Sequence, residues 1–269
     1  MTNPDDVADI GNLLNRLRDA DTGKRVFGSD LHGYRLGSVL SEAELAAFES
    51  VHGVRLPEDY RRFLATCGNG GAGPFLGLHP LGACGDLSRP FPFTRATDQL
   101  TQEELRQFPD PFLDYPGLHA LCDQGCDGYS YLVVNGPAYG TVWDSGDAFW
   151  PTNLTFGVWY RRWLERALRN LENERRLPRL RVGMSRAEVL AAVGGEWEAR
   201  PVDPMPPFSE SDDLPAQLVL PAGRRLWLFE SIDFPAQLVL DDRDRVVQII
   251  PDPFIPAIPN DPFIPAIPN

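Results

Sequence analysis

The chain has 269 residues, of which 38 are acidic and 25 basic, so its formal net charge is −13. A hydrophobic content of 43% is typical of a globular protein, and the length allows one large domain or two ordinary ones. The charge argues against a general nucleic-acid binder, whose footprint is basic, and against binding to an anionic membrane surface. It is compatible with a basic protein partner, because complementary charges accelerate encounter and favour the correct pairing.

The first residues and the cysteines both favour the cytoplasm. Residues 1–14 have neither the cationic nor the apolar segment of a secretory signal, and no run approaches the roughly 18 apolar residues of a membrane span. Cysteines at irregular spacing are expected to be buried, reduced thiols: Cys67, Cys84, Cys122 and Cys126. The alternative is a zinc site formed with His32, His52, His79 or His119, but we expect neither a metal nor a cofactor.

Helical signals dominate the start of the chain. Apolar residues at helical spacing predict a helix over residues 5–19, and residues 20–40 are expected to form loop and a short strand. Ser41 and Glu44 have the spacing of a capping box, in which each side chain bonds the other residue's backbone N–H. Pro57 opens the next helix, whose predicted buried stripe is Tyr60, Phe63 and Leu64.

Strand signals follow in the middle of the chain. Three strands are predicted, at 74–82, 129–135 and 141–144. The turn Asn135-Gly136-Pro137 joins the last two as a hairpin. A proline-rich acidic connector lies between 86 and 116. A long amphipathic helix is predicted at 157–176, and Pro178 ends it and marks the expected domain boundary.

A second unit is predicted from Arg181. Ser185 and Glu188 repeat the capping-box spacing and start a helix that runs to Val193. After a proline-rich acidic loop, four strands are predicted at 216–220, 225–231, 235–240 and 245–250. The string PAQLVL occurs in the first and third of these strands without any longer repeat period, so we interpret it as two similar strands.

The last residues are a tandem duplication. DPFIPAIPN occurs at 252–260 and again at 261–269, and its prolines favour an extended tail. The tail is either a duplication with no fixed structure or a docking motif, with Phe254, Ile255, Phe263 and Ile264 as anchors.

No motif supports catalysis. Gly68-x-Gly70-x-x-Gly73 matches the dinucleotide-binding pattern by letter, but a predicted helix precedes it and Pro74 follows it. The pair Asp144 and Asp147 has the chemistry for acid–base work, but without a partner in a defined pocket we interpret it as part of a solvated acidic face. We therefore do not expect an enzyme, and we assign no catalytic, cofactor-binding or metal-binding residue.

Two blocks of sequence carry a family resemblance. The first has the pattern Gly53, Leu56-Pro57, Asp59-Tyr60, Phe63 and Asn69-Gly70-Gly71. The second, residues 125–143 (GCDGYSYLVVNGPAYGTVW), contains N-G-P and V-W. In this order the two blocks resemble the SUKH superfamily, the group that includes the Smi/Knr-type domains, over about residues 27–176. The resemblance implies an α+β fold with a mixed, mainly antiparallel sheet flanked by helices.

The same resemblance implies a binding function. Many bacterial domains of this type are immunity proteins that neutralise toxins of polymorphic or contact-dependent inhibition systems, and others are regulatory interaction proteins. We therefore expect an immunity protein that occludes a cognate protein toxin, for example a basic nuclease. The alternative is a non-catalytic regulatory or scaffold module. The oligomeric state stays open.

The second unit resembles a different group. Gly183, Met184, Ser185, Glu188, Val189 and Gly194 match the pattern of the small SmpA/BamE-like helix-then-sheet domains. The expected domains are therefore an N-terminal helix (1–26), a SUKH-like domain (27–178), a small helix-then-antiparallel-sheet domain (179–250) and the tail (251–269).

Acidic residues are concentrated in one region. Residues 96–158 contain nine acidic residues and a single basic one, whereas residues 161–181 contain eight arginines and three glutamates. An acidic face of this kind suits a basic partner. The partner-binding residues that we predict are Asp110, Asp114, Asp123, Asp127, Asp144 and Asp147.

Overall fold

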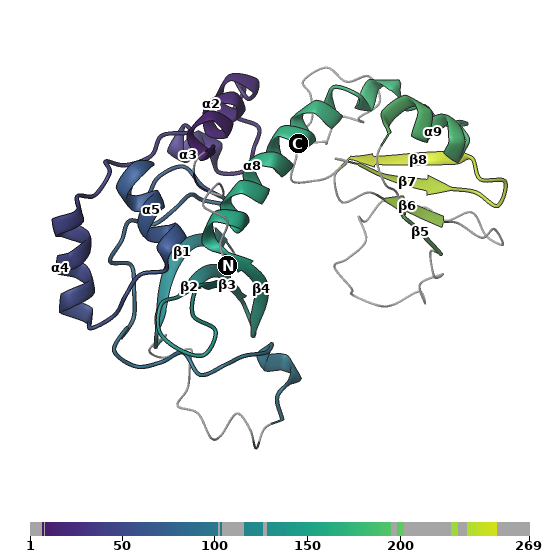
Figure 1. Cartoon of the computed structure of the whole chain (residues 1–269). Helices are drawn as coiled ribbons and strands as arrows, with labels where there is room; N and C mark the ends of the chain where they lie inside the picture. Colours follow the sequence, from purple (N-terminus) through teal and green to yellow (C-terminus); the bar gives the residue numbers. More distant parts are fainter. Residues whose placement is uncertain are drawn as a thin grey trace, which may run out of the picture. The chain divides into compact units, whose positions relative to one another are not determined.

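The computed structural model of the chain divides into two compact units, Met1–Leu168 and Arg169–Asn269 (Figure 1). It describes residues 7, 9–101, 103, 116–125, 128–194, 198–201, 227–230 and 236–251. For 198–201, 227–230, 236–237 and 250–251 the description covers the backbone alone. The division between the units falls within the long helix α8 (Phe156–Glu174).

The helices of the first unit follow the local signals of the sequence. They are α2 (Ile10–Ala20), α3 (Ser29–His32), α4 (Glu42–His52) and α5 (Glu58–Thr66). The predicted capping box starts α4, where the Glu44 N–H donates to the Ser41 hydroxyl at 3.3 Å and the Ser41 N–H donates to the Glu44 carboxylate at 2.8 Å. The apolar stripes of α2 and α5 are buried as predicted, through Ile10, Leu13, Leu14 and Leu17 in α2 and Tyr60, Phe63 and Leu64 in α5.

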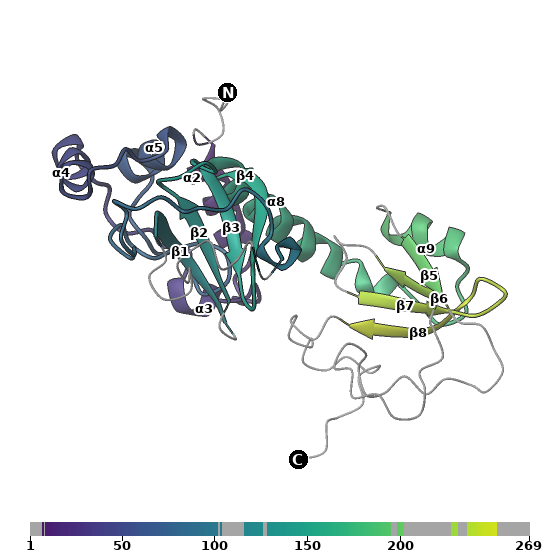
Figure 2. The same ribbon diagram turned by 90° about the horizontal axis from the view of Figure 1, so that it is seen from below.

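A four-stranded antiparallel sheet forms the centre of the first unit. Its strands are β1 (Leu118–Gly125), β2 (Gly128–Val133), β3 (Thr141–Ser145) and β4 (Phe149–Thr155), and they lie side by side in chain order (Figure 2). The hairpin predicted around Gly136 joins β2 to β3. A short 3-10 helix, η1 (Thr97–Gln99), precedes the sheet, and α8 follows it directly. The α+β class is therefore confirmed.

Each face of this sheet is covered by aromatic side chains. On one face, Phe91 and Phe93 of the segment before η1 pack with Tyr131, Trp143 and Phe149 in a buried cluster. On the other face, the hydroxyl of Tyr60 in α5 lies 2.7 Å from Nε2 of His119 in β1. Rings of α5 and α8 contact each other above that face, through Tyr60, Phe63, Phe156 and Tyr160. The sheet is thus the middle layer of the unit.

Two sequence-based strand assignments in the first unit were wrong. Residues 74–82 form no strand; this segment makes only single bridges, from Leu78 to Gly71 and to Cys122. Two prolines lack the N–H that a ladder needs, and Gly77 has a positive φ of 99°, which breaks the extended conformation. The short strand expected in 20–40 is likewise a single bridge at Leu36, and α3 forms nearby.

Two strands were absent from the sequence-based assignment, β1 and β4. The ladder of β1 has register shifts between Ala120 and Cys122 and between Asp123 and Gly125, so the apolar alternation of a strand is interrupted. Strand β4 is an edge strand that contains Pro151, and Asn153 has a positive φ of 59°. Both features remove the usual strand signal, and an edge position tolerates them.

The second unit is a helix packed on a second four-stranded antiparallel sheet. Helix α9 (Arg186–Val193) precedes the strands β5 (Glu198–Pro201), β6 (Trp227–Glu230), β7 (Ala236–Leu240) and β8 (Val246–Pro251), which are ordered as in the chain. A second 3-10 helix, η2 (Leu177–Arg179), comes before α9. The core joins helix to sheet through Leu180, Val189, Val193, Leu238, Leu240 and Val246. Strand predictions at 225–231, 235–240 and 245–250 are confirmed.

Several predicted features lie outside the described residues. They are the strand at 216–220, most of the loop at 201–214 and the duplicated tail at 252–269. No helix among the described residues is both long and apolar enough to cross a bilayer.

Candidate partner-binding surface

The Asp59-Tyr60 pair connects the two helices that cover the sheet. The Asp59 side chain is buried, and its Oδ2 accepts the backbone N–H of Gly157, in the first turn of α8, at 2.9 Å. The same carboxylate accepts the N–H of Tyr60 at 2.9 Å. An acceptor at a helix N-terminus satisfies one of the orphan N–H groups and favours the helix dipole. These two motif residues therefore have a structural role.

Of the six aspartates predicted to bind a partner, the structure describes Asp123, Asp144 and Asp147. Asp110, Asp114 and Asp127 lie outside the described residues. The sheet register places Asp123 opposite Tyr129, and Tyr129 opposite Ser145, whereas Asp144 is opposite Ser130 in the adjacent row. Neighbouring rows project from opposite faces of a sheet, so Asp123 and Asp144 point away from each other.

Asp144 is half-buried and bonded within the sheet. Its Oδ1 accepts the Ser130 hydroxyl at 2.6 Å and the Gln124 amide at 2.8 Å. Burial raises the pKa of Asp144 above its usual value, although these two hydrogen bonds act in the opposite direction. Because desolvation dominates, the carboxylate is held in an environment that opposes its negative charge.

Asp147 is exposed in the turn between β3 and β4, next to an exposed tryptophan. Trp150 is 38% exposed, and its indole N–H donates to Asp98 Oδ2 at 2.9 Å. Thr97, the residue before Asp98, accepts the backbone N–H of Phe149 at 2.8 Å through its hydroxyl. Two consecutive residues of η1 thus bond two consecutive residues of β4. Neither Asp98 nor Trp150 was among the predicted site residues, because they are 52 positions apart.

Phe75 occupies a backbone conformation that a bulky residue rarely adopts. It has a positive φ of 52° in the turn closed by the Gly77 N–H and the Pro74 carbonyl at 2.9 Å, where glycine or asparagine is favoured. Its side chain is 37% exposed. A Cβ built on Gly28 would lie 1.7 Å from the Phe75 carbonyl oxygen, so only glycine fits beside this turn. Leu31, three residues beyond Gly28, is 66% exposed.

The histidines and cysteines show no metal-site geometry in the part of the chain that is described. No group of three potential metal ligands occurs there, and Cys67, Cys84 and Cys122 are free thiols. His119 is fully buried, and burial lowers its pKa to about 4. It is therefore a neutral hydrogen-bonding partner of Tyr60 at physiological pH.

Comparison with known protein families finds a match within the first unit. Residues 39–163 match the SMI1 / KNR4 family (SUKH-1). This segment is similar to a SUKH-1 domain. It includes α4, α5, the whole first sheet and the start of α8. Comparison with curated proteins and with solved structures gave no match. The resemblance inferred from Gly53 to Asn69 and from the central hairpin is confirmed.

The segment that matches the SUKH-1 family contains the exposed residues Asp98, Asp147 and Trp150. Asp98, Asp147 and Trp150 all lie within residues 39–163, and so does Phe75. Leu31 lies outside the matched segment. The candidate surface around Trp150 is therefore part of the domain itself.

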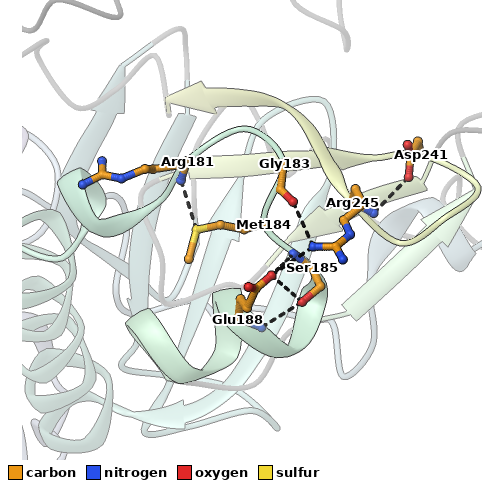
Figure 3. Close-up of polar contacts among 7 residues, drawn as sticks. All are labelled: Arg181, Gly183, Met184, Ser185, Glu188, Asp241 and Arg245. Carbon is orange, nitrogen blue, oxygen red and sulfur yellow. Dashed lines mark hydrogen bonds and ion pairs between the residues drawn. The ribbon is translucent and has the colours of Figure 1, made fainter.

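Polar contacts of the second unit stabilise the start of α9 (Figure 3). The N–H of Ser185 donates to Glu188 Oε2 at 2.7 Å, and the Glu188 N–H donates to the Ser185 hydroxyl at 3.3 Å. Arg245, next to β8, donates to the Gly183 carbonyl and to Glu188, both at 3.1 Å. Asp241 in turn accepts the Arg245 N–H at 3.0 Å. These contacts hold the turn between β7 and β8 against the start of α9. None of them presents a free reactive group.

Proposed function

We propose that this protein is an immunity protein, which binds a cognate protein toxin and neutralises it by covering the toxin's active site. The observation that carries the proposal is the SUKH-1 match over residues 39–163, because domains of this type include many bacterial immunity proteins. Such domains act by binding, and the sequence offers no catalytic motif. A protein partner, with no cofactor on this chain, follows from that class of function.

The charge distribution supports a basic partner. Arg106 is the single basic residue between 96 and 158, and it stands against nine acidic ones. Among the described members of this set, Asp98, which accepts the Trp150 indole N–H, and Asp147, three residues before Trp150, are exposed. Opposite charges steer two proteins together and raise the rate of association, especially at low salt. A basic nuclease toxin has the matching charge, and an acidic surface resembles the phosphate backbone of its substrate.

Co-expression tests the proposal directly. The product of the gene that precedes this one is expressed with and without the full chain, and survival is scored. We expect the chain to restore growth and to form a complex that weakens as salt concentration rises. Growth arrest despite equal expression of the chain, together with no complex at low salt, would contradict the proposal. It would favour the alternative, a regulatory or scaffold module with another partner.

A further inference from the structure

Three carboxylates lie on the two segments that adjoin the exposed Trp150: Asp98 on η1, and Asp144 and Asp147 on the β3–β4 hairpin. Asp144 is the cross-strand partner of Trp150, so the two side chains project from the same face of the sheet. Asp147 lies in the turn that joins their strands, and Asp98 accepts the indole N–H. A Cβ built on Gly146 would lie 3.6 Å from the Trp150 ring, which places that turn against the ring. We call these four residues, Asp98, Asp144, Asp147 and Trp150, the Trp150 cluster.

The negative charge of this cluster is not compensated within the described part of the chain. Asp98, Asp144 and Asp147 form no ion pair with any described residue. Among the described residues, the Asp144 carboxylate is bonded to Ser130 and Gln124 through Oδ1, and neither of these partners carries a charge. A half-buried carboxylate without a counter-charge is unfavourable, and a cation placed beside it relieves that cost.

The Trp150 ring is held in position before any partner binds. Two hydrogen bonds, Asp98–Trp150 and Thr97–Phe149, join consecutive residues of η1 to consecutive residues of β4 and so hold the two elements together. An aromatic ring that is already ordered loses little conformational entropy on binding, which is the property of interface residues that contribute most affinity.

We propose that the Trp150 cluster is the receptor for an arginine side chain of the partner protein. A guanidinium stacks on an indole ring, and its fork of N–H donors bonds carboxylates at the ring's edge. Lysine fits less well, because its compact ammonium is more strongly hydrated and has no planar surface to stack. This inference rests on the proposed function for the nature of the partner, but the chemistry of the cluster is testable without it.

The first experiment uses defined probes on the full chain. N-acetyl-arginine amide is titrated into the ¹⁵N-labelled protein at constant ionic strength, and N-acetyl-citrulline amide serves as the neutral probe of the same shape. The indole N–H signal of Trp150 is assigned from its loss in Trp150→Phe. We expect that signal to shift with arginine and not with citrulline. Equal shifts with both probes, or no shift with either, would overturn the proposal.

Charge variants make this experiment specific. In Asp98→Asn an amide oxygen remains to accept the indole N–H, so the ring stays in place while one charge is removed. We expect Asp98→Asn combined with Asp147→Asn to reduce the arginine-induced shift at least about threefold. Asp19→Asn, whose side chain is 74% exposed on α2, removes the same kind of charge elsewhere and should leave the shift unchanged. An equal reduction by Asp19→Asn would show a general charge effect and contradict the receptor.

The second experiment measures affinity for the co-expressed toxin. We expect Trp150→Leu, and the Asp98→Asn, Asp147→Asn pair, each to weaken the complex at least about tenfold, the size typical of a central interface residue. Unchanged affinity in these variants, or a loss caused only by a change at the exposed Leu31 (Leu31→Ser), would overturn the arginine receptor and leave the immunity function standing. A toxin that binds no version of the chain contradicts the proposed function, and the arginine probe then decides the receptor alone.

Discussion

The carboxylate of Asp59 accepts the backbone N–H of Gly157 at 2.9 Å, although the two residues are 98 positions apart in the sequence. This single contact joins the first turn of α5 to the first turn of α8, and the four strands of the first sheet lie between them in the chain. Asp59 therefore acts as a helix cap supplied by a distant segment. It explains on physical grounds why an aspartate precedes Tyr60 in the motif.

Removal of this cap should destabilise the first unit. For Asp59→Ala we expect a loss of about 1–3 kcal/mol in the free energy of unfolding, because the buried Gly157 N–H loses its acceptor. Asp59→Asn retains an oxygen at that position and should lose less. Glu58→Ala, at the neighbouring and 64% exposed position, is the control and should change stability by under about 0.5 kcal/mol. Urea unfolding followed by tryptophan fluorescence measures all three; equal losses for Glu58→Ala and Asp59→Ala would refute the cap.

Acidification should weaken the first unit through His119. Burial lowers the pKa of this histidine from 6.5 to about 4, so the folded state binds fewer protons than the unfolded state between these values. Its contribution to stability is complete above about pH 6.5 and is lost progressively as the pH falls toward about 4. Between about pH 7 and about pH 5 this loss amounts to roughly 2 kcal/mol.

The test compares the wild type with His119→Gln, whose amide retains a partner for the Tyr60 hydroxyl. Asp144 acts with the opposite sign, since a carboxyl whose pKa is raised in the folded state gains stability as the pH falls. It is present in both proteins and cancels in the comparison. We expect the wild type to lose more stability on acidification than His119→Gln. Parallel pH profiles would show that the histidine is not held neutral.

Asp144 should respond differently to loss of charge and to loss of hydrogen bonding. In Asp144→Asn the amide oxygen accepts from Ser130 and Gln124 while the cost of the half-buried charge disappears, so stability at neutral pH should be equal or higher. Asp144→Ala leaves the fully buried Ser130 hydroxyl without this acceptor and should cost about 1–3 kcal/mol. Thermal unfolding of the two variants measures this difference. A larger loss of stability in Asp144→Asn than in Asp144→Ala would contradict the prediction.

The two capping boxes offer a matched pair of local tests. Ser41 and Ser185 make the same contacts with Glu44 and Glu188, but they belong to different units. We expect each Ser→Ala change to cost about 1 kcal/mol. Amide hydrogen exchange should then accelerate in α4 for Ser41→Ala and in α9 for Ser185→Ala. Acceleration of both helices by either change would mean that the two units unfold together.

Much of the helical structure, and the hairpin between β2 and β3, was predictable from local signals. The capping boxes, the stripe of Tyr60, Phe63 and Leu64, and the hairpin around Gly136 all formed where the sequence placed them. Each depends on residues within a few positions of one another, where spacing alone determines which side chains and N–H groups meet. The edge strands were not predictable in this way, because the bulges of β1 and the Pro151 of β4 hide the alternation of a strand.

Sequence alone determined that this chain is acidic, that its acidic residues gather between 96 and 158, and that its two-block pattern is that of a SUKH domain. The interpretation based on the sequence treated the aspartates of that region as one equivalent set. Tertiary structure separated those that it describes: Asp144 is half-buried, Asp123 points from the other face, and Asp147 is exposed in the turn that reaches Trp150, which Asp98 holds from a distant segment. The physical reason is that charge is a property of composition, whereas desolvation and neighbours depend on contacts between residues far apart in the chain.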